Sequence, residues 1–285
     1  MKKLLIPLLL ISSVSMAQDR LSQMISPAFH PVTFEDPRNI SEARLLYVHH
    51  AIDDAFVTEG GDVNVYALQL RYAINEDLAI IATKDGYVDF NPNAVLKKDE
   101  GWADLGLGAK YALYRDNDKG QIVSAALRYI IPTGDEEVLQ GQGDGIVHPS
   151  VSAAAALTNE VTLTAGTGFR IPVDGADSTM WDADVQVDYR VDLCDGQALY
   201  PLLGVSMVNV ADGGRRLPIA DEGQDFFDFG STGAEGETMV IGAAGARYRL
   251  NETVDFGAAY QFPFDKDEGT RVLDYRWTID AIARF

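Results

Sequence analysis

Twelve segments in which polar and apolar residues alternate constrain the fold of this chain more than any other feature of the sequence. They lie approximately at residues 42–53, 62–74, 77–88, 102–114, 120–131, 147–157, 160–172, 180–192, 198–210, 237–249, 252–264 and 271–285. Because successive side chains of a strand point to opposite faces, this period of two predicts β-strands. A tilted membrane strand needs about 9–11 residues, and single-chain bacterial barrels use even numbers of strands. The pattern therefore predicts an all-β transmembrane antiparallel up-and-down barrel over residues 41–285.

The connections between these segments are sorted by length. Short ones follow the even-numbered segments, as at Asn75-Glu76 and Thr158-Asn159, and mostly longer ones follow the odd-numbered segments, as at 89–101, 132–146 and 211–236. A barrel with both termini in the periplasm has short turns on that side and long loops outside. A soluble sandwich has no reason for this sorting, so the connections favour the barrel.

One face of the best segments is charged and the other is apolar. A charged side chain facing lipid at mid-bilayer costs about 2–4 kcal/mol, so the charged face is expected to line the lumen. The expected lumen-lining residues are Asp104, Lys110, Arg128, Arg170, Asp182, Asp184, Asp188, Arg190, Arg247, Arg249, Asp255, Asp274, Arg276, Asp280 and Arg284. Charges of both signs at close quarters pair, so we expect a nearly neutral lining and a narrow bore.

The last fifteen residues, RVLDYRWTIDAIARF, have the same two faces, with Leu273, Tyr275 and Trp277 on the apolar side. Aromatic residues near both ends are typical of the two interfacial belts of a membrane barrel. The terminal Phe285 resembles the C-terminal assembly signal of bacterial outer-membrane barrels. The segment is therefore expected to close the barrel, with the assembly machinery as a partner.

The N-terminus predicts export from the cytoplasm. A basic start, an apolar run at 4–11 and a small-residue site at 15–17 predict a signal peptide over residues 1–17. Residues 18–40 contain three prolines and no sustained period, so they are expected to form an extended leader. This leader either enters the lumen as a partial plug or remains in the periplasm.

Composition limits the partners of the protein. A formal net charge of −20 disfavours nucleic acids and anionic lipid surfaces. The single Cys194 cannot form an internal disulfide. The expected partners are outer-membrane lipid and lipopolysaccharide, the assembly machinery and a small-molecule substrate, with no cofactor and no metal.

Four stretches carry a family resemblance: WADLGLGAKYALYR (102–115), LRYIIPTGD (127–135), GQGDGIVHPSVSAAAAL (141–157) and VTLTAGTGFRIP (161–172). They resemble the outer-membrane transporter family associated with phenol meta-degradation pathways. Membership implies an outer-membrane barrel that takes up small hydrophobic or aromatic compounds. The resemblance supplies no catalytic or binding residues.

Enzymatic interpretations find little support in the sequence. His148 and Ser150 resemble the His-x-Ser pair of outer-membrane lipid hydrolases, and their spacing puts both on one strand face. Pro149 stands between them, and no neighbouring Asn or Gly completes the motif. His30, His49 and His50 are too scattered for a zinc site, and there is no GxSxG or phosphate loop.

The connection at 211–236 combines acidic and aromatic residues, namely Asp221, Glu222, Asp225, Phe226, Phe227, Asp228 and Phe229. Carboxylates among glycines can bind calcium, but the spacing of an EF-hand is absent, which favours a solvated acidic loop. The phenylalanines either fold inward over the lumen or contact lipopolysaccharide.

The sequence therefore predicts a non-enzymatic outer-membrane pore for passive uptake of small molecules. A structural or surface-interaction barrel with a filled lumen and a lipid hydrolase remain alternatives. If the four acids of 211–236 give the mouth a negative potential, the pore should have a small conductance with a mild cation preference.

Overall fold

The chain is almost entirely β-structure in a computed structural model that describes residues 19–225, 227–265 and 272–285. The expected signal peptide and Phe226 lie outside the described residues. Within these residues, one short helix, α1 (Arg20–Gln23), precedes the strands, and two 3-10 turns, η1 (Glu136–Val138) and η2 (Cys194–Gly196), lie between them. None of the described helices has the length and apolar character needed to cross a membrane.

The described residues form fifteen strands in one sheet. They are β1 (Glu42–Ile52), β2 (Gly61–Ala73), β3 (Leu78–Lys84), β4 (Tyr87–Pro92), β5 (Asp99–Trp102), β6 (Leu105–Asp116), β7 (Gln121–Ile131), β8 (Ile146–Ala156), β9 (Val161–Pro172), β10 (Thr179–Tyr189), β11 (Val191–Asp192), β12 (Ala198–Asp212), β13 (Thr238–Arg249), β14 (Val254–Pro263) and β15 (Tyr275–Arg284).

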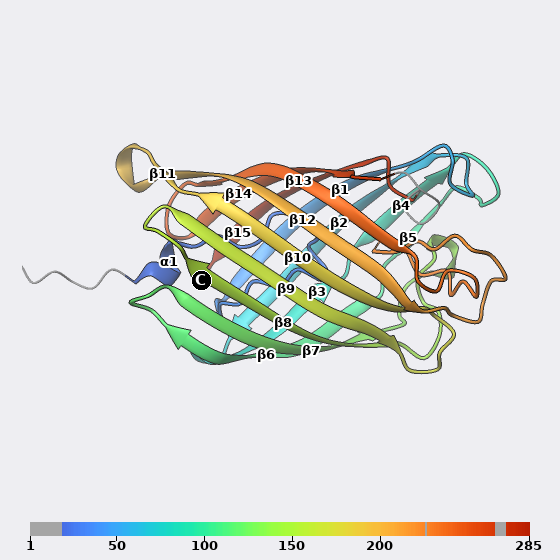
Figure 1. The fold of residues 1–285 in the computed structure, drawn as a ribbon, viewed down its shortest axis with the longest axis horizontal. Helices are drawn as coiled ribbons and strands as arrows, with labels where there is room; N and C mark the ends of the chain where they lie inside the picture. Colours follow the sequence, from blue (N-terminus) through green and yellow to red (C-terminus); the bar gives the residue numbers. More distant parts are fainter. Residues whose placement is uncertain (1–18, 226, 266–271) are drawn as a thin grey trace, which may run out of the picture.

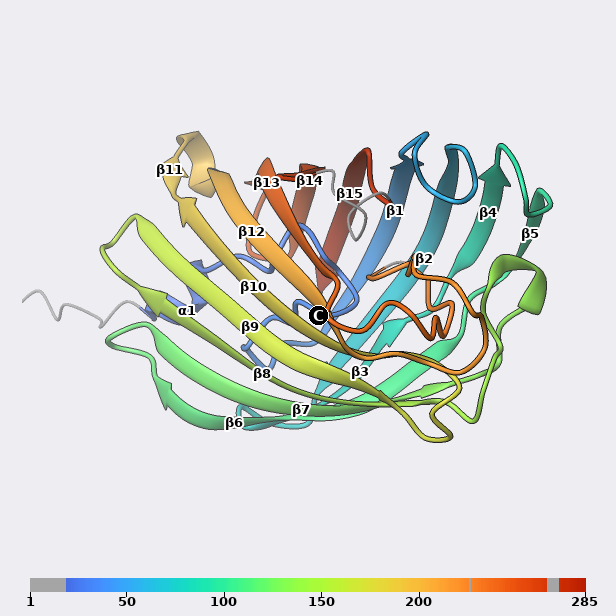
Figure 2. The ribbon, with the colours of Figure 1, turned by 45° about the vertical axis from the view of Figure 1, so that its right-hand side comes forward.

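The sheet closes on itself as a barrel (Figures 1 and 2). β1 pairs antiparallel with β2 on one side and with β15 on the other, from Glu42↔Arg284 to Ala51↔Tyr275. β3 with β4 and β5 with β6 each supply one wall strand, and β11 extends β10, so the wall has twelve strands. The prediction of a twelve-stranded antiparallel barrel is confirmed.

Apolar side chains cover the outside of the barrel. In β15, Trp277 and Ile279 are exposed, whereas the alternating Arg276, Thr278 and Asp280 are buried inside. Leu273 was predicted to face outward with them, but it precedes β15 and packs in an interior cluster. An apolar exterior over a closed ladder is what a β-structure needs to span a membrane.

The third and fourth wall strands are each broken, although the sequence pattern predicted continuous strands at 77–88 and 102–114. β3 pairs with β2 as far as Ala82↔Leu70, and β4 resumes the pairing at Tyr87↔Tyr66. Gly86 has a φ of +126°, and a Cβ there would lie 2.7 Å from the Tyr66 carbonyl oxygen. The neighbouring strand stops at Trp102 and resumes at Leu105. The regular ladder is therefore interrupted at one level in two adjacent strands, which remain joined there because the Ala103 N–H donates to the Gly86 carbonyl at 2.8 Å.

The two ends of the barrel differ. α1 and the short turns gather at one end, and the long connections gather at the other (Figure 1). By the rule for such barrels, the first end is periplasmic and the second is extracellular. The connection predicted at 89–101 is shorter than expected, because β4 and β5 extend as a hairpin through Pro92 and from Asp99.

Deleting residues 276–285 should abolish the closed barrel. Without β15, both β1 and β14 lose their ladder partner and expose open edges to lipid. Heat-modifiable migration and protease resistance in outer-membrane fractions would measure this loss. Deleting residues 19–28 instead removes the same length from outside the strands and should leave a closed barrel. A closed barrel in both deletions would contradict the closure argument.

Candidate functional site

The leader, residues 19–40, lies inside the lumen. It enters from the turn end, where Arg20 N–H donates to the Asn117 carbonyl, and returns there, where Asn39 donates to the Glu76 carbonyl. Its apex at residues 30–33 lines a cavity further up the barrel. Of the two places that the sequence left open for these residues, the structure has them in the lumen.

Glu35 is the main anchor of the leader. Its carboxylate accepts hydrogen bonds from Arg71 of β2 at 2.9 Å, Lys110 of β6 at 2.9 Å and Arg128 of β7 at 3.2 Å. All four side chains are buried. Burial alone would raise the pKa of Glu35, but these cations outweigh it and hold the pKa well below the ordinary value. Glu35 therefore stays ionised and ties three wall strands to the leader.

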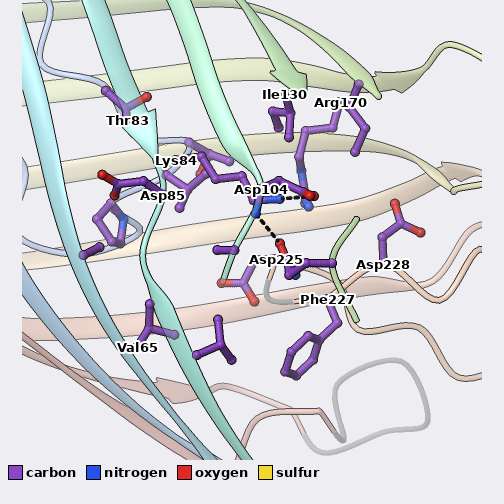
Figure 3. Close-up of a pocket in the computed structure, with 18 of the residues that line it drawn as sticks. Val65, Thr83, Lys84, Asp85, Asp104, Ile130, Arg170, Asp225, Phe227 and Asp228 are labelled. Carbon is purple, nitrogen blue, oxygen red and sulfur yellow. Dashed lines mark hydrogen bonds and ion pairs between the residues drawn. The ribbon is translucent and has the colours of Figure 1, made fainter. Parts of the chain in front are cut away.

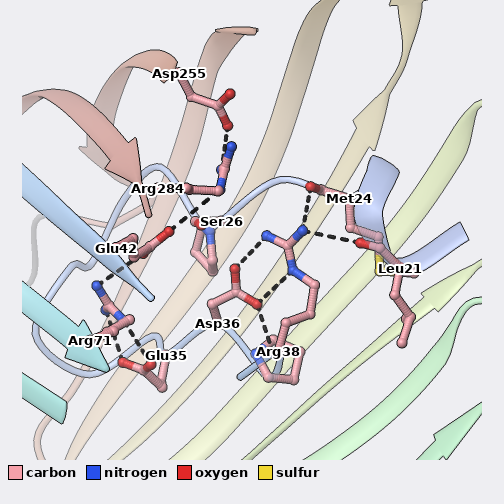
Figure 4. Close-up of polar contacts among 12 residues, drawn as sticks. Leu21, Met24, Ser26, Glu35, Asp36, Arg38, Glu42, Arg71, Asp255 and Arg284 are labelled. Atoms are coloured by element: carbon pink, nitrogen blue, oxygen red, sulfur yellow. Dashed lines mark hydrogen bonds and ion pairs between the residues drawn. The ribbon is translucent and has the colours of Figure 1, made fainter. Parts of the chain in front are cut away.

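The chain of ion pairs continues around Glu35 (Figure 4). Arg71 also contacts Glu42, and Arg284 bridges Glu42 and Asp255. Within the leader, Arg38 forms a two-pronged pair with Asp36 and donates to the carbonyls of Leu21 and Met24. The leader is thus braced against itself as well as against the wall.

Wall side chains also satisfy the backbone of the leader. Arg249 donates to the carbonyls of Ser22, Gln23 and Met24, and Arg247 donates to the Ser26 carbonyl. Apolar packing is added by a cluster made of Ile25, Ala28, Phe29, Phe34, Ala198, Tyr200, Leu202, Ala243 and Ala259. An extended segment without its own hydrogen-bond ladder can remain buried because the wall supplies the missing partners.

His30 joins the leader to the extracellular connection 213–237. Its Nδ1 lies 2.7 Å from Asp184 of β10, and its Nε2 lies 2.9 Å from Asp225. Asp225 in turn accepts two hydrogen bonds from Arg276 of β15. Burial would lower the pKa of His30, but Asp184 and Asp225 outweigh it and raise the pKa to about 10. His30 is therefore a cation at neutral pH.

The acidic connection folds inward, which corrects two predictions. Glu222 is buried and accepts hydrogen bonds from Ser178 and from the N–H groups of Phe229 and Ser231. Asp225 is also paired, as described above, and Asp228 accepts from the N–H groups of Ser178 and Gly230. Asp221 is half-buried. These four acids therefore neither form a solvated loop nor give the mouth an exposed negative potential.

Two of the three phenylalanines of this connection point into the barrel. Phe227 packs on Phe90 with ring centroids 5.2 Å apart, and Phe229 stacks on Phe56 at 5.9 Å. They belong to a large interior apolar cluster at the extracellular end. The sequence left open whether these rings fold inward over the lumen or contact lipopolysaccharide, and Phe227 and Phe229 fold inward.

Most of the predicted lumen residues are buried and paired. Arg170 forms a two-pronged pair with Asp182, Arg247 pairs with Asp280, and Arg249 pairs with Asp255. Asp104 accepts from the N–H groups of Gly134 and Gly141 and pairs with Lys84, and Asp188 lies 3.5 Å from the Gln186 amide.

Two predicted lumen residues lie elsewhere. Arg190 follows the end of β10 and pairs with the exposed Asp192, and Asp274 precedes β15 and is half-buried. Both were placed inside by extending the strand pattern past the point where the ladder ends. They lie at opposite ends of the barrel, not along the lumen.

Several functional residues were missed by the sequence analysis. Glu35, Asp36 and Arg38 lie in a proline-containing segment without a period, and Arg44 and Arg71 lie in the first two strands. Arg71 could have been found, because it continues the inward series of Ala67 and Gln69 in β2. The leader residues gave no signal beyond mixed charge.

A cavity of about 130 Å³ lies above the leader, toward the extracellular end. We call it the lumen cavity. The apex of the leader forms its floor, and Phe227 and Asp228 face Thr83 and Asp85 across it (Figure 3). Its apolar lining consists of Val32, Leu46, Val48, Val65, Ala67, Val88, Ala103, Ile130, Leu139, Ile146 and Phe227. Charged and polar side chains also line the lumen cavity, including Lys84, Asp85, Asp104, Arg170, Asp177 and Arg216.

A second cavity of about 840 Å³, the wall cavity, opens on the outside of the same wall. Membrane-facing side chains including Leu45, Tyr66, Trp102 and Ile279 line it. Four residues line both cavities, namely Leu46, Ala67, Asp85 and Ala103. They surround the level at which the regular ladder of the third and fourth wall strands is interrupted, so the two cavities lie on opposite faces of the wall at that level.

The hydrolase pair is not assembled as a catalytic pair. His148 is buried, its Nδ1 lies 3.2 Å from Arg128, and its Nε2 has no partner in the described part of the chain. No hydrogen bond joins His148 to Ser150 among the described residues. Activation of a serine by histidine needs that contact. Within the same residues, no group of three or more His, Cys, Asp or Glu is arranged to hold a metal ion.

The family described as "Putative MetA-pathway of phenol degradation" matches residues 40–280. The chain belongs to this family. The resemblance found in the sequence is thereby confirmed. The match begins where the leader ends, so it covers the barrel. No match was found among curated proteins.

Solved outer-membrane barrels share the fold. The COG4313 outer membrane channel from Pseudomonas putida F1 is 16% identical, with a TM-score of 0.61 over 92% of this chain and 100% of that one. The NanC porin is 8% identical, with a TM-score of 0.50 over 86% and 99%. The protein is therefore an outer-membrane β-barrel.

Replacing Glu35 with Gln should loosen the leader. Removing one charge from a buried set of ion pairs costs about 3–5 kcal/mol, because Lys110 and Arg128 lose the countercharge of Glu35 and Arg71 keeps that of Glu42. Single-channel current in a planar bilayer should rise several-fold and become anion-selective. The control is Glu76→Gln, which removes an exposed pair with Arg115 worth about 0–1 kcal/mol. Equal currents in both variants would contradict the anchoring role of Glu35.

The leader should also loosen as the pH rises. The pKa of His30 is raised from 6.5 to about 10, so the stability that its protonation supplies is complete below 6.5 and is lost as the pH approaches 10. Ion current should therefore increase over this interval. His30→Gln should flatten the profile, and an unchanged profile in that variant would assign the pH effect to another group.

Proposed function

We propose that the protein passively takes up small apolar molecules, which enter the lumen cavity from outside and leave sideways through the interrupted wall. The observation that carries this proposal is the adjacency of the lumen cavity and the wall cavity at Leu46, Ala67, Asp85 and Ala103. A molecule that moves between them passes from the extracellular lumen to the lipid-facing surface.

The straight path through the barrel is unsuited to this task. Below the lumen cavity, the leader and its buried ion pairs occupy the bore. Moving an apolar molecule past paired charges would require breaking pairs in a low-dielectric interior. The sideways route needs no movement of the leader and passes Leu46, Ala67 and Ala103, with Asp85 beside them.

The linings of both cavities favour apolar cargo. Val48, Val65 and Val88 line the lumen cavity, and Tyr66 and Trp102 line the wall cavity. Concave, mostly apolar pockets with a few polar groups are the usual sites for small organic molecules. The name of the family links it to phenol degradation, and the Pseudomonas putida relative is described as an outer membrane channel. The name of the family supports aromatic compounds as the cargo.

A barrel whose filled lumen serves only structure is the second candidate, because the leader does fill half of the bore. A purely structural role does not explain why the ladder is interrupted in two adjacent strands beside the lumen cavity. The unassembled His148 and Ser150 pair supports a protein without hydrolase activity.

Filling the junction should block uptake without affecting ion current. Ala67 points inward and lines both cavities, so Ala67→Trp should slow entry of an apolar dye into protein-containing liposomes by about tenfold, the effect of ~1.4 kcal/mol on a barrier. Single-channel current should change little. Ala165→Trp, which adds the same bulk to the outer face of β9, is the control. Equal dye entry in wild type and Ala67→Trp would reject the sideways route.

A further inference from the structure

We propose that Gln69, Thr83 and Asp85 form a hydrogen-bonding site that selects, among small apolar molecules, those that carry a hydroxyl donor. The inference rests on the proposed function, because it assigns a substrate class and selecting residues to the same passage.

Each of the three side chains has a buried oxygen without a hydrogen-bond partner among the described residues: Gln69 Oε1, Thr83 Oγ1 and Asp85 Oδ1. Gln69 is 1% exposed and Thr83 is 0% exposed. All three residues line the lumen cavity, and Asp85 lines the wall cavity too. Figure 3 shows Thr83 and Asp85 on the same side of the lumen cavity.

The broken strand explains why these oxygens lack partners. Residues 67–69 of β2 lie between the two pairings with β3 and β4, so Thr83 and Asp85 are at the point where the regular ladder stops. The amide of Gln69 is fixed by its nitrogen, which donates to the Thr83 carbonyl at 2.7 Å and to the Pro31 carbonyl at 2.9 Å. Its oxygen is therefore held in place without a protein donor.

Unpaired buried acceptors are unfavourable, and native proteins contain few of them. Three such oxygens beside one cavity mark a place where a polar group of a bound ligand can form a hydrogen bond. The amide oxygen and the carboxylate only accept, and the threonine hydroxyl both donates and accepts. The missing group is therefore a donor, and the negative charge of Asp85 disfavours anions.

The remainder of the cavity fixes the body of the ligand. Leu46, Val48, Val65 and Val88 provide an apolar lining. The volume is about 130 Å³, and an apolar cavity of about 150 Å³ holds a benzene ring. The site thus fits a single-ring molecule with one hydroxyl, whose proton pairs with one of the three oxygens, and an equally sized molecule without a donor would leave all three without one.

Binding of p-cresol and 4-methylanisole tests this selection, because methylation of the hydroxyl removes only the donor. Calorimetric titration of the full protein in lipid nanodiscs, with empty nanodiscs subtracted, should give at least about tenfold tighter binding of p-cresol. Thr83→Val, which keeps the shape, and Asp85→Asn should each weaken p-cresol binding about fivefold and change 4-methylanisole binding less than twofold. Asp118→Asn, in an exposed turn, should change neither.

Equal affinity of the two ligands for the wild type would overturn the proposal, as would equal losses for both ligands in Thr83→Val. Entry of both ligands into liposomes separates this failure from that of the proposed function. If the protein accelerates the entry of both ligands equally, the proposed passage is retained and selection by the hydroxyl is wrong. If the protein accelerates the entry of neither ligand, the proposed passage is wrong.

Discussion

The buried carboxylate of Glu35, held by Arg71, Lys110 and Arg128, is the interaction on which the arrangement of the lumen depends. A charge inside a barrel is stable only when it is paired. The inward face of the wall contains several cations, and the leader supplies part of the countercharge. The two parts therefore depend on each other. The leader neutralises buried cations of the wall, and these cations hold the leader in the bore.

This pairing divides the lumen in two. The periplasmic half is filled by the leader and by ion pairs, whereas the extracellular half contains apolar clusters and the lumen cavity. The inward-folded connection 213–237 lies over the upper half, and His30 links it to the leader through Asp225. Where the upper half meets the irregular part of the third and fourth wall strands, the lumen cavity and the wall cavity share four lining residues. In the proposed function, the filled axis and the sideways route are two parts of one arrangement.

The alternation of the strands was sufficient to predict the barrel, its strand number and the inward positions of residues such as Lys110 and Asp280, because one face of those strands must avoid lipid. It failed at the third and fourth wall strands. Gly86, whose φ of +126° favours glycine, interrupts a segment whose alternation of side chains otherwise suggested one continuous strand. The acids of 211–236 were misplaced because their partners, Ser178 and Arg276, lie far away in sequence. Only the folded chain brings them together.

Locking the leader in the lumen tests the central claim most directly. Ala28 N–H donates to the Gln186 side chain at 3.1 Å, so cysteines at these positions, with Cys194 replaced by serine, can be joined by a short bifunctional reagent. Entry of an apolar dye into liposomes is then measured before and after crosslinking. The sideways route predicts an unchanged rate, because the leader does not have to move. A rate that falls to that of protein-free liposomes on crosslinking would show that cargo passes along the axis and would contradict the account.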